Sequence, residues 1–238
     1  QRWKAPTFTP AQALAVGFAL LILIGTVLLA LPLSQAPGQR LSLTDAFFMA
    51  TSAVCVTGLA VVDVSTTFST FGEIVLVLLV QAGGLGIMSL SAMMFLLTGR
   101  RIGLQERLMM QEALGSFSIA GVVRLTRTII TATLAVEAVG AVLLSLRFLE
   151  YYPPGQALYF GIFHAVTAFN NAGFDLTSQS LRVFQRDPVV LLVFAGLILL
   201  GGMGFVVLQD IWRQRRWDRF SLQTKIVLVV TGALVGVG

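Results

Sequence analysis

Phe47–Leu59 reads F-F-M-A-T-S-A-V-C-V-T-G-L, and Ile162–Phe174 repeats it in altered form as I-F-H-A-V-T-A-F-N-N-A-G-F. In both copies a small polar residue and an alanine precede one glycine by five or six places. Downstream, Gly83–Gly86 is matched at nearly the same offset by Gly201–Gly204. Two similar units, each a hydrophobic helix, a short loop that ends in glycine and another hydrophobic helix, indicate an ion pore.

The composition places these repeats in a membrane. Hydrophobic residues make up 56% of the 238-residue chain and charged residues only 11%, which excludes an ordinary soluble domain. The uncharged runs long enough to cross a ~30 Å hydrocarbon core are Ala11–Leu31, Ile74–Leu97 and Val189–Gln209. Thr128–Leu146 is interrupted only by Glu137, and Ile226 opens a further apolar run. We therefore predict an all-α, multi-pass membrane protein with four spans and the start of a fifth.

The basic residues predict the orientation of the chain. Twelve of the 16 lie before the first span or in the connections 98–127 and 210–225, and four lie in the other connections. By the positive-inside rule the first group and the N-terminus are cytoplasmic, in a cell membrane. Pro37, Asp63 and Pro153 are then external. The net charge of +5 is therefore a topology signal, and no nucleic-acid partner is expected.

Two segments are too short to span and are predicted to be pore helices. Thr44–Asp45 suits a helix start, and Ala46–Ala53 then covers about two turns, roughly 12 Å, or half a membrane. Ala157–Ala168 is the second pore helix. The chain returns through Val54–Leu59 and Phe169–Phe174 as extended strands. Non-helical backbone at membrane depth is tolerated only where protein buries it or water lines it.

Backbone carbonyls in these return segments can replace the hydration shell of a cation. Gly58 and Gly173 lack a Cβ, so they can turn with positive φ and keep the narrowest space clear. The pore helices point their negative C-terminal ends toward the membrane centre, which favours cations. The predicted filter residues are Val54, Cys55, Val56, Thr57, Gly58, Phe169, Asn170, Asn171, Ala172 and Gly173.

Together these motifs resemble a known family. Thr51–Leu59 (T-S-A-V-C-V-T-G-L) with Gln81–Gly86 (Q-A-G-G-L-G) is similar to the first repeat of the Ktr/Trk/HKT superfamily of potassium-uptake proteins. Phe169–Phe174 (F-N-N-A-G-F) resembles its second filter loop, and Leu104–Leu114 resembles especially the KtrB branch of ion-translocating subunits. The resemblance covers nearly the whole chain. It implies four such units around one pseudo-fourfold cation pore, of which two and the start of a third are present.

The resemblance also implies a function and partners. In the family the filter glycines, here Gly58 and Gly173, favour K+ over Na+, so K+ is the expected substrate and no cofactor is expected. The family forms homodimers in the membrane and assembles on a cytoplasmic ring of nucleotide-binding regulatory subunits. Arg107 and Arg124 are candidate regulator-docking residues, with a helix resting on lipid at the membrane surface as the alternative.

The expected segments follow from the repeats. They are the first helix–pore loop–helix repeat (1–97), a cytoplasmic amphipathic connection (98–127), the second repeat (128–209), a cytoplasmic basic connection (210–225) and the start of a third repeat (226–238). The chain starts without methionine and stops inside an apolar run, so we expect it to be part of a longer protein.

Several other residues have plain structural readings. Glu137 lies mid-span and should face protein, because an unpaired carboxylate there is costly. His164, on the second pore helix, is expected to pack or hydrogen-bond. The glycine clusters indicate close helix packing, with a hinge as the less favoured alternative. The outer carboxylates, which could concentrate cations at the pore mouth, are Asp63, Asp175 and Asp187.

The leading hypothesis is therefore K+ uptake through a channel-like pore. An alternating-access cation carrier is the alternative, although the two repeats share one orientation and many carriers use inverted repeats. An enzyme is not predicted, because the sequence contains no catalytic triad, nucleotide-binding fingerprint or metal-ligand cluster. The single cysteine, Cys55, excludes an internal disulfide.

Overall fold

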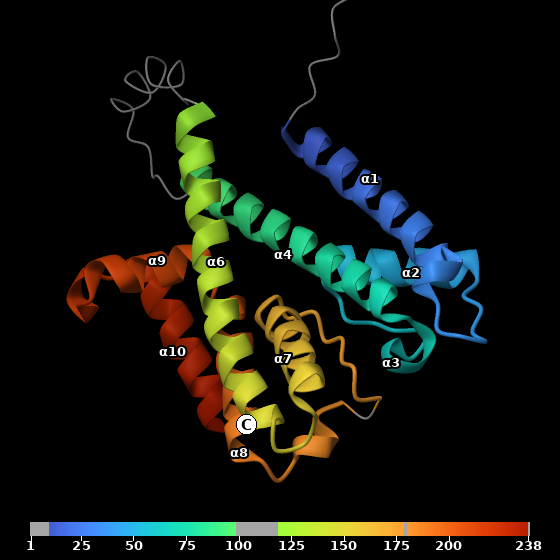
Figure 1. The fold of residues 1–238 in the computed structure, drawn as a ribbon. Coiled ribbons are helices and arrows are strands. Elements are labelled where there is room, and N and C mark those ends of the chain that lie inside the picture. The colour runs from blue at the N-terminus through green and yellow to red at the C-terminus, as the bar shows by residue number, and fades with distance from the viewer. Residues whose placement is uncertain (1–9, 99–118, 179, 238) are drawn as a thin grey trace, which may run out of the picture. The chain divides into compact units, whose positions relative to one another are not determined.

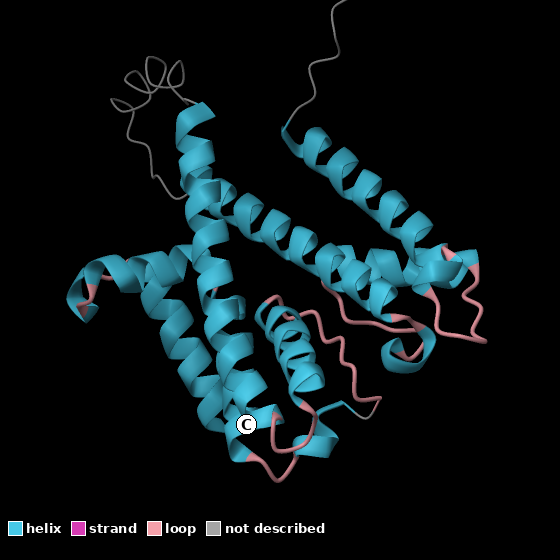
Figure 2. Ribbon diagram, in the orientation of Figure 1, coloured by secondary structure: helices cyan, strands magenta, loops and turns pink. Residues whose placement is uncertain are grey.

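The computed structural model describes residues 10–98, 119–178 and 180–237 (Figure 1). These residues form helices joined by loops, with one isolated antiparallel bridge between Gln35 and Phe68 (Figure 2). The predicted all-α class is confirmed. The chain divides into two compact units, which are described separately below: Gln1–Gly84 with Asn170–Pro188, and Leu85–Phe169 with Val189–Gly238.

The first unit contains both segments that follow the short helices. Its elements are α1 (Pro10–Ala30), η1 (Pro32–Ser34), α2 (Leu43–Val54), α3 (Val64–Thr67), the first half of α4 (Thr70–Thr98) and η3 (Ser180–Phe184). Gly25 of α1 allows α1, α2 and α4 to pack closely against one another. A Cβ added at Gly25 of α1 would lie 2.7 Å from Leu79 Cδ1 of α4 and 3.3 Å from Ala50 Cβ of α2. Met49 and Leu76 are fully buried in this core.

The short helix α2 begins earlier than predicted. Its N-cap is Ser42, whose hydroxyl accepts a hydrogen bond from the Asp45 amide at 3.1 Å, and the helix starts at Leu43. The predicted start at Thr44–Asp45 is therefore too late, since the cap is Ser42, two residues before Thr44. Serine is as good a cap as threonine, and Asp45 occupies the first turn, where its charge suits the positive end of the helix.

The second unit contains the second half of α4 and the longest helix. Its other elements are α6 (Ile119–Phe148), α7 (Pro154–Phe169), most of α8 (Pro188–Met203), α9 (Phe205–Gln214), η4 (Trp217–Arg219) and α10 (Leu222–Val237). The helices α6 and α7 pack closely at Gly161, which has no Cβ. A Cβ added there would lie only 2.9 Å from the Ala141 carbonyl oxygen. Phe148 and His164 fill the space between them and are both buried.

The predicted span Val189–Gln209 is not one helix. Between α8 and α9, Gly204 has φ +80°, and the two helices meet at an angle of 96°. An α-helix cannot continue through a residue in this conformation, which glycine adopts without a Cβ penalty. Within this cluster Gly204 therefore breaks the helix, whereas Gly201 is buried inside α8. The matching Gly83–Gly86 stays inside the continuous helix α4.

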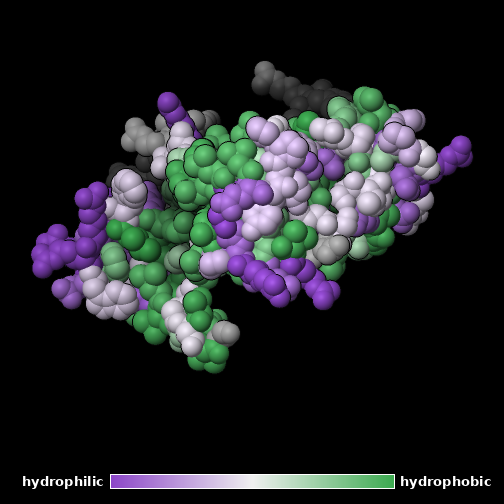
Figure 3. All heavy atoms as spheres, turned by 60° about the horizontal axis from the view of Figure 1, so that its bottom comes forward, coloured by the Kyte–Doolittle hydropathy of each residue, from purple (hydrophilic) through white to green (hydrophobic). Residues whose placement is uncertain are grey.

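Two described helices are long and apolar enough to cross a membrane, through Thr70–Ser89 and Thr126–Phe148. The bent pair α8–α9 is a third if it counts as one span, and Ala15–Ala30 and Leu222–Val237 are shorter apolar helices. Hydrophobic side chains cover much of the visible surface (Figure 3). Examples with more than half of their surface exposed are Leu78, Val139 and Leu192. This exposure is typical of helices that face lipid.

Helices begin inside two of the predicted connections. The helix α6 begins at Ile119, inside the connection predicted for 98–127, so Arg124 and Arg127 are helical residues. Likewise α10 begins at Leu222, inside the connection predicted for 210–225. The predicted amphipathic helix Leu104–Leu114, with Arg107, lies outside the described residues. Polar and basic residues can extend a helix beyond its apolar stretch, so hydropathy alone understates helix length.

Candidate cation site

The first loop leaves α2 through a tight turn that is tied back to the helix. The Cys55 amide donates to the Thr51 carbonyl at 2.8 Å, and the Thr57 amide donates to the Ser52 carbonyl at 3.0 Å. The hydroxyls of Ser52 and Thr57 are hydrogen-bonded at 3.0 Å. The turn therefore depends on small polar residues within the first repeat itself.

Both loops have the same unusual backbone. In the first loop Val56 has φ +54° and Gly58 has φ +70°. At the matching positions of the second loop Asn171 has φ +57° and Gly173 has φ +73°. A valine with positive φ is costly and persists only where the surroundings enforce it. The two sequence repeats therefore have matching backbone geometry. The positive φ of Val56 and Asn171 was not predicted from the sequence.

The two loops meet at their glycines. A Cβ added at Gly58 would overlap the carbonyl oxygen of Ala172 and lie 3.2 Å from Gly173 Cα. A Cβ at Gly173 would lie 3.5 Å from Gly58 Cα, which is an ordinary contact. The structure therefore brings Gly58, Ala172 and Gly173 into direct contact. The close contact between the two loops therefore excludes a side chain at Gly58 but not at Gly173.

Two predicted ligands do not belong to the loops. Val54 and Phe169 are the last residues of α2 and α7, and both are buried. A Cβ added at Gly83 of α4 would overlap the Val54 carbonyl oxygen, so this carbonyl faces α4. The position of Val54 therefore does not support its predicted role as a ligand. The other predicted filter residues stay candidates for backbone ligation: Cys55, Val56, Thr57, Gly58, Phe169, Asn170, Asn171, Ala172 and Gly173.

A polar contact behind the second loop was missed in the sequence analysis. The Asn170 side chain donates from Nδ2 to Oε1 of Gln81, on α4, at 3.2 Å. Asn170 is buried and lies against Gly84, where an added Cβ would be 2.7 Å from Asn170 Cγ. The Q-A-G-G motif that carried the family resemblance contains both Gln81 and Gly84. The position of Gln81 just before Gly83 and Gly84 was the sequence feature that could have indicated this contact.

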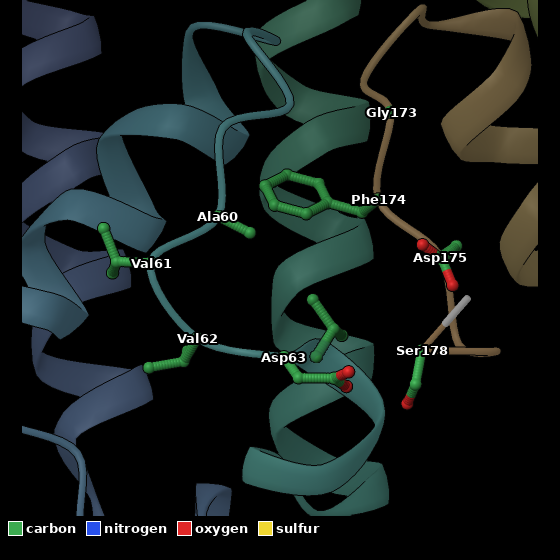
Figure 4. Close-up of a pocket in the computed structure, with 9 residues that line it drawn as sticks. Ala60, Val61, Val62, Asp63, Gly173, Phe174, Asp175 and Ser178 are labelled. Carbon is green, nitrogen blue, oxygen red and sulfur yellow. The ribbon is translucent and has the colours of Figure 1, made fainter. Parts of the chain in front are cut away.

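A pocket of about 310 Å³ lies where the two loops end (Figure 4). Its lining residues are Ala60, Val61, Val62, Asp63, Val64, Gly173, Phe174, Asp175 and Ser178. The carboxyl group of Asp63 points toward the segment that carries Asp175 and Ser178 (Figure 4). Both predicted carboxylates therefore line this pocket. The third, Asp187, is buried and is not among the lining residues, so the structure does not place it at a mouth.

Asp63 caps α3 and keeps its charge. Its Oδ1 accepts hydrogen bonds from the Ser65 and Thr66 amides at 2.9 and 3.2 Å, and Ser65 is in turn hydrogen-bonded to Ser178. Burial raises the pKa of Asp63, but the hydrogen bonds from Ser65, Ser178 and Thr66 outweigh it, so the pKa lies below its ordinary value. Asp63 is therefore ionised at neutral pH and supplies a negative charge to the pocket.

The remaining singled-out side chains, His164 and Glu137, are buried. His164 is 1% exposed, its Nδ1 lies 2.7 Å from the Phe160 carbonyl oxygen, and its ring contacts Phe148 and Phe194 edge-on. The expectation that it packs and hydrogen-bonds is confirmed. Glu137 is 4% exposed, so it faces protein as expected. Among the described residues no group of three His, Cys, Asp or Glu side chains could hold a metal ion.

Apolar spanning helices and two half-length helices that end in strained backbone loops define a membrane protein of the ion-transport class. Comparison with known families makes this specific: the TrkH family, described as cation transport protein, matches residues 7–230. The chain belongs to this family, which consists of transport proteins rather than enzymes. This confirms the resemblance to the Ktr/Trk/HKT superfamily.

Individual relatives agree with this assignment. The chain is 45% identical over 228 residues to Ktr system potassium uptake protein B of Bacillus subtilis, covering 96% of this chain and 50% of the relative. It is 41% identical to the protein of the same name from Vibrio alginolyticus, over 95% of this chain and 50% of the relative. It is 37% identical to the potassium/sodium uptake protein NtpJ of Enterococcus hirae, with the same coverage. The chain thus spans about half the length of the curated relatives it matches.

Proposed function

We propose that this chain carries two of the filter loops of a K+ uptake protein, and that the backbone carbonyls of both loops bind the ion. The observation that carries this proposal is the matched pair of loops with positive φ at Val56 and Gly58 and at Asn171 and Gly173. The names of the relatives support K+ as the ion. The name of the Enterococcus hirae relative makes Na+ the second candidate.

The backbone geometry suggests how the loops act. In an ordinary strand successive carbonyls point to opposite sides, and reversing the sign of φ at alternate residues turns them toward one side. Carbonyl oxygens aligned in this way replace the water shell of a cation without a charged ligand. The C-terminal ends of α2 and α7 add partial negative charge where the loops begin. The pocket with Asp63 and Asp175 lies at the other end of the loops and attracts cations.

The membrane potential is sufficient to drive uptake through such a pore. Moving one positive charge inward across 100 mV yields about 2.3 kcal/mol, which corresponds to roughly a fiftyfold concentration ratio. No coupled energy source is then needed for accumulation. This is the channel-like form of the proposal.

Uptake by the full-length protein tests the proposal. Cells that lack their own K+ uptake systems should grow at low external K+ when they express it, and should take up Rb+ in a manner that K+ inhibits and Na+ inhibits more weakly. The physical reason is that carbonyl rings of this kind coordinate the larger ion. Growth at low K+ that is no better than with an empty vector, despite protein in the membrane, would exclude the proposed function.

The same proposal includes an orientation, with the N-terminus and the segment after α9 on the cytoplasmic side. Single cysteines at the exposed positions Gln39 and Asp218, in a Cys55→Ser background, distinguish the two faces. We expect an impermeant thiol reagent outside intact cells to label position 39 and to reach position 218 only after permeabilisation. The converse labelling pattern would invert the orientation and move the Asp63 pocket to the inside.

We also propose a homodimer that binds a cytoplasmic ring of nucleotide-binding subunits, with Arg107 and Arg124 near the contact. Arg107 lies outside the described residues, and Arg124 lies in α6. Reversing both charges with glutamate should weaken co-purification of such a regulator and leave the dimer intact. Unchanged co-purification would assign the docking role to other residues.

A further inference from the structure

The two loops are held in place by different means, although their backbones match. In the first loop Ser52 and Thr57 join their hydroxyls at 3.0 Å. The matching residues of the second loop are Thr167 and Ala172. Ala172 has no hydroxyl, and Thr167 donates instead to the His164 carbonyl at 3.3 Å. The second loop therefore cannot form the hydroxyl–hydroxyl bond of the first, and a contact with another element can take its place.

The anchor that the structure offers lies on α4. Gln81 and Gly84 are three residues apart on this helix, so they lie on the same face. Gln81 Oε1 accepts the hydrogen bond from Asn170 Nδ2, and the bare backbone at Gly84 makes room for the same side chain. A Cβ at Gly84 would overlap Asn170 Oδ1, so this contact tolerates no larger residue without displacement. Together Gln81 and Gly84 form a seat for Asn170.

The contacts of Asn170 with Gln81 and Gly84 can restrict the conformation of the second filter loop, because Asn170 is the first residue of that loop. It is the first residue after α7 and precedes Asn171, whose φ is +57°. Its side chain is buried, at 5% exposure, so it cannot reorient without breaking the contacts with α4. Fixing the side chain fixes the direction in which the chain leaves α7, and hence the carbonyls of Asn171 and Ala172.

We propose that Gln81 is a positioning residue for ion selectivity: the seat formed by Gln81 and Gly84 sets the conformation of the second filter loop. This inference rests on the proposed function. Gln81 touches Asn170 through its side chain and acts on the ion only through the loop. Loss of the Gln81 side chain should reduce the K+/Na+ preference more than it reduces the amount of folded protein, because the loop can relax while α2 and α4 remain packed.

The test compares two replacements of similar size. Gln81→Met fills the same volume but cannot accept the hydrogen bond, whereas Gln81→Glu keeps an oxygen at the acceptor position. In the full-length protein we expect Gln81→Met to lower the K+/Na+ preference about tenfold, the size expected when one buried hydrogen bond is lost. Its KM for K+ should rise while the maximal rate changes less. Gln81→Glu should retain a preference within about threefold of the original.

Two further variants keep the inference testable if Gln81→Met does not fold. Gln81→Asn is one methylene shorter and cannot reach Asn170, so it should lose preference as Gln81→Met does. Gly84→Ala pushes on Asn170 with Gln81 intact and should give the same phenotype. The control is Ala82→Val, on an exposed position of the same helix, which should leave the preference unchanged.

The outcomes separate this inference from the proposed function. An original protein that takes up no K+ refutes the proposed function. If the original protein discriminates K+ from Na+ and the folded variants Gln81→Asn and Gly84→Ala do so equally well, the seat does not set selectivity. Equal losses in Gln81→Met and Gln81→Glu would likewise exclude the hydrogen bond as the cause.

Discussion

Replacing Gly58 by alanine should reduce the preference for K+ over Na+ about a hundredfold, or about 2.7 kcal/mol. Two physical effects combine at this residue. Its φ of +70° costs an alanine roughly 1–2 kcal/mol. In addition, the new Cβ would overlap the Ala172 carbonyl oxygen, which is itself a proposed ligand. The loops must then move apart, and the carbonyls no longer fit the ion.

The same change at Gly173 should have a smaller effect, about tenfold, because only the backbone term applies there. Its φ is +73°, but an added Cβ would be 3.5 Å from the nearest atom. K+ uptake in competition with Na+ by the full-length variants measures both effects. Gly38→Ala is the matched control, since Gly38 has φ +84° with no atom within 4 Å of an added Cβ. Equal losses at Gly58 and Gly173 would contradict the role of the loop contact, and no loss at either would remove the cation site.

The second large effect is expected from Gly83→Ala, which should lower the melting temperature and abolish most uptake. Alanine inside a helix normally gains about 1 kcal/mol over glycine. At Gly83, however, the Cβ would overlap the Val54 carbonyl oxygen and lie 2.7 Å from its carbon, both backbone atoms at the end of α2. Overpacking of this kind costs roughly 1–3 kcal/mol. The usual gain is therefore reversed, and the start of the first filter loop is displaced.

Gly196→Ala is the control for this prediction. Gly196 lies inside α8, and no atom lies within 4 Å of an added Cβ, so the ordinary gain in helix propensity should appear. Thermal unfolding of the purified proteins in detergent compares the two. A Gly83→Ala protein that melts at or above the temperature of the original would show that α2 and α4 are not in close contact at this point.

Much of the candidate site was predictable because it depends on local chemistry. Short apolar helices flanked by full-length ones are expected to re-enter the membrane, and each is followed by a loop that contains one glycine. Gly58 and Gly173 could therefore be named from their spacing alone. The membrane class followed from the uncharged runs, since each unpaired polar backbone group in lipid is too costly for anything but helices or closed barrels.

Other features depend on contacts between residues far apart in the chain. The two glycine clusters have nearly the same sequence, yet Gly86 lies inside the continuous helix α4 while its counterpart Gly204 lies at a bend of 96° between α8 and α9. No local property distinguishes them, because both conformations are available to glycine and the neighbours decide between them. The same is true of Val54, whose carbonyl faces α4 and not the loop, and of the hydrogen bond between Gln81 and Asn170.

The sequence by itself determined that the chain spans a membrane, that it contains two matched helix–loop–helix segments, and where their glycines lie. These properties follow from hydropathy, length and the absence of a Cβ, which are local. Only the tertiary structure decided that the Val54 carbonyl faces α4, that Gly58 rather than Gly173 is sterically closed, and that Asn170 is hydrogen-bonded to Gln81 of α4. These depend on distances of a few tenths of an ångström between separate segments, and such distances are set by packing.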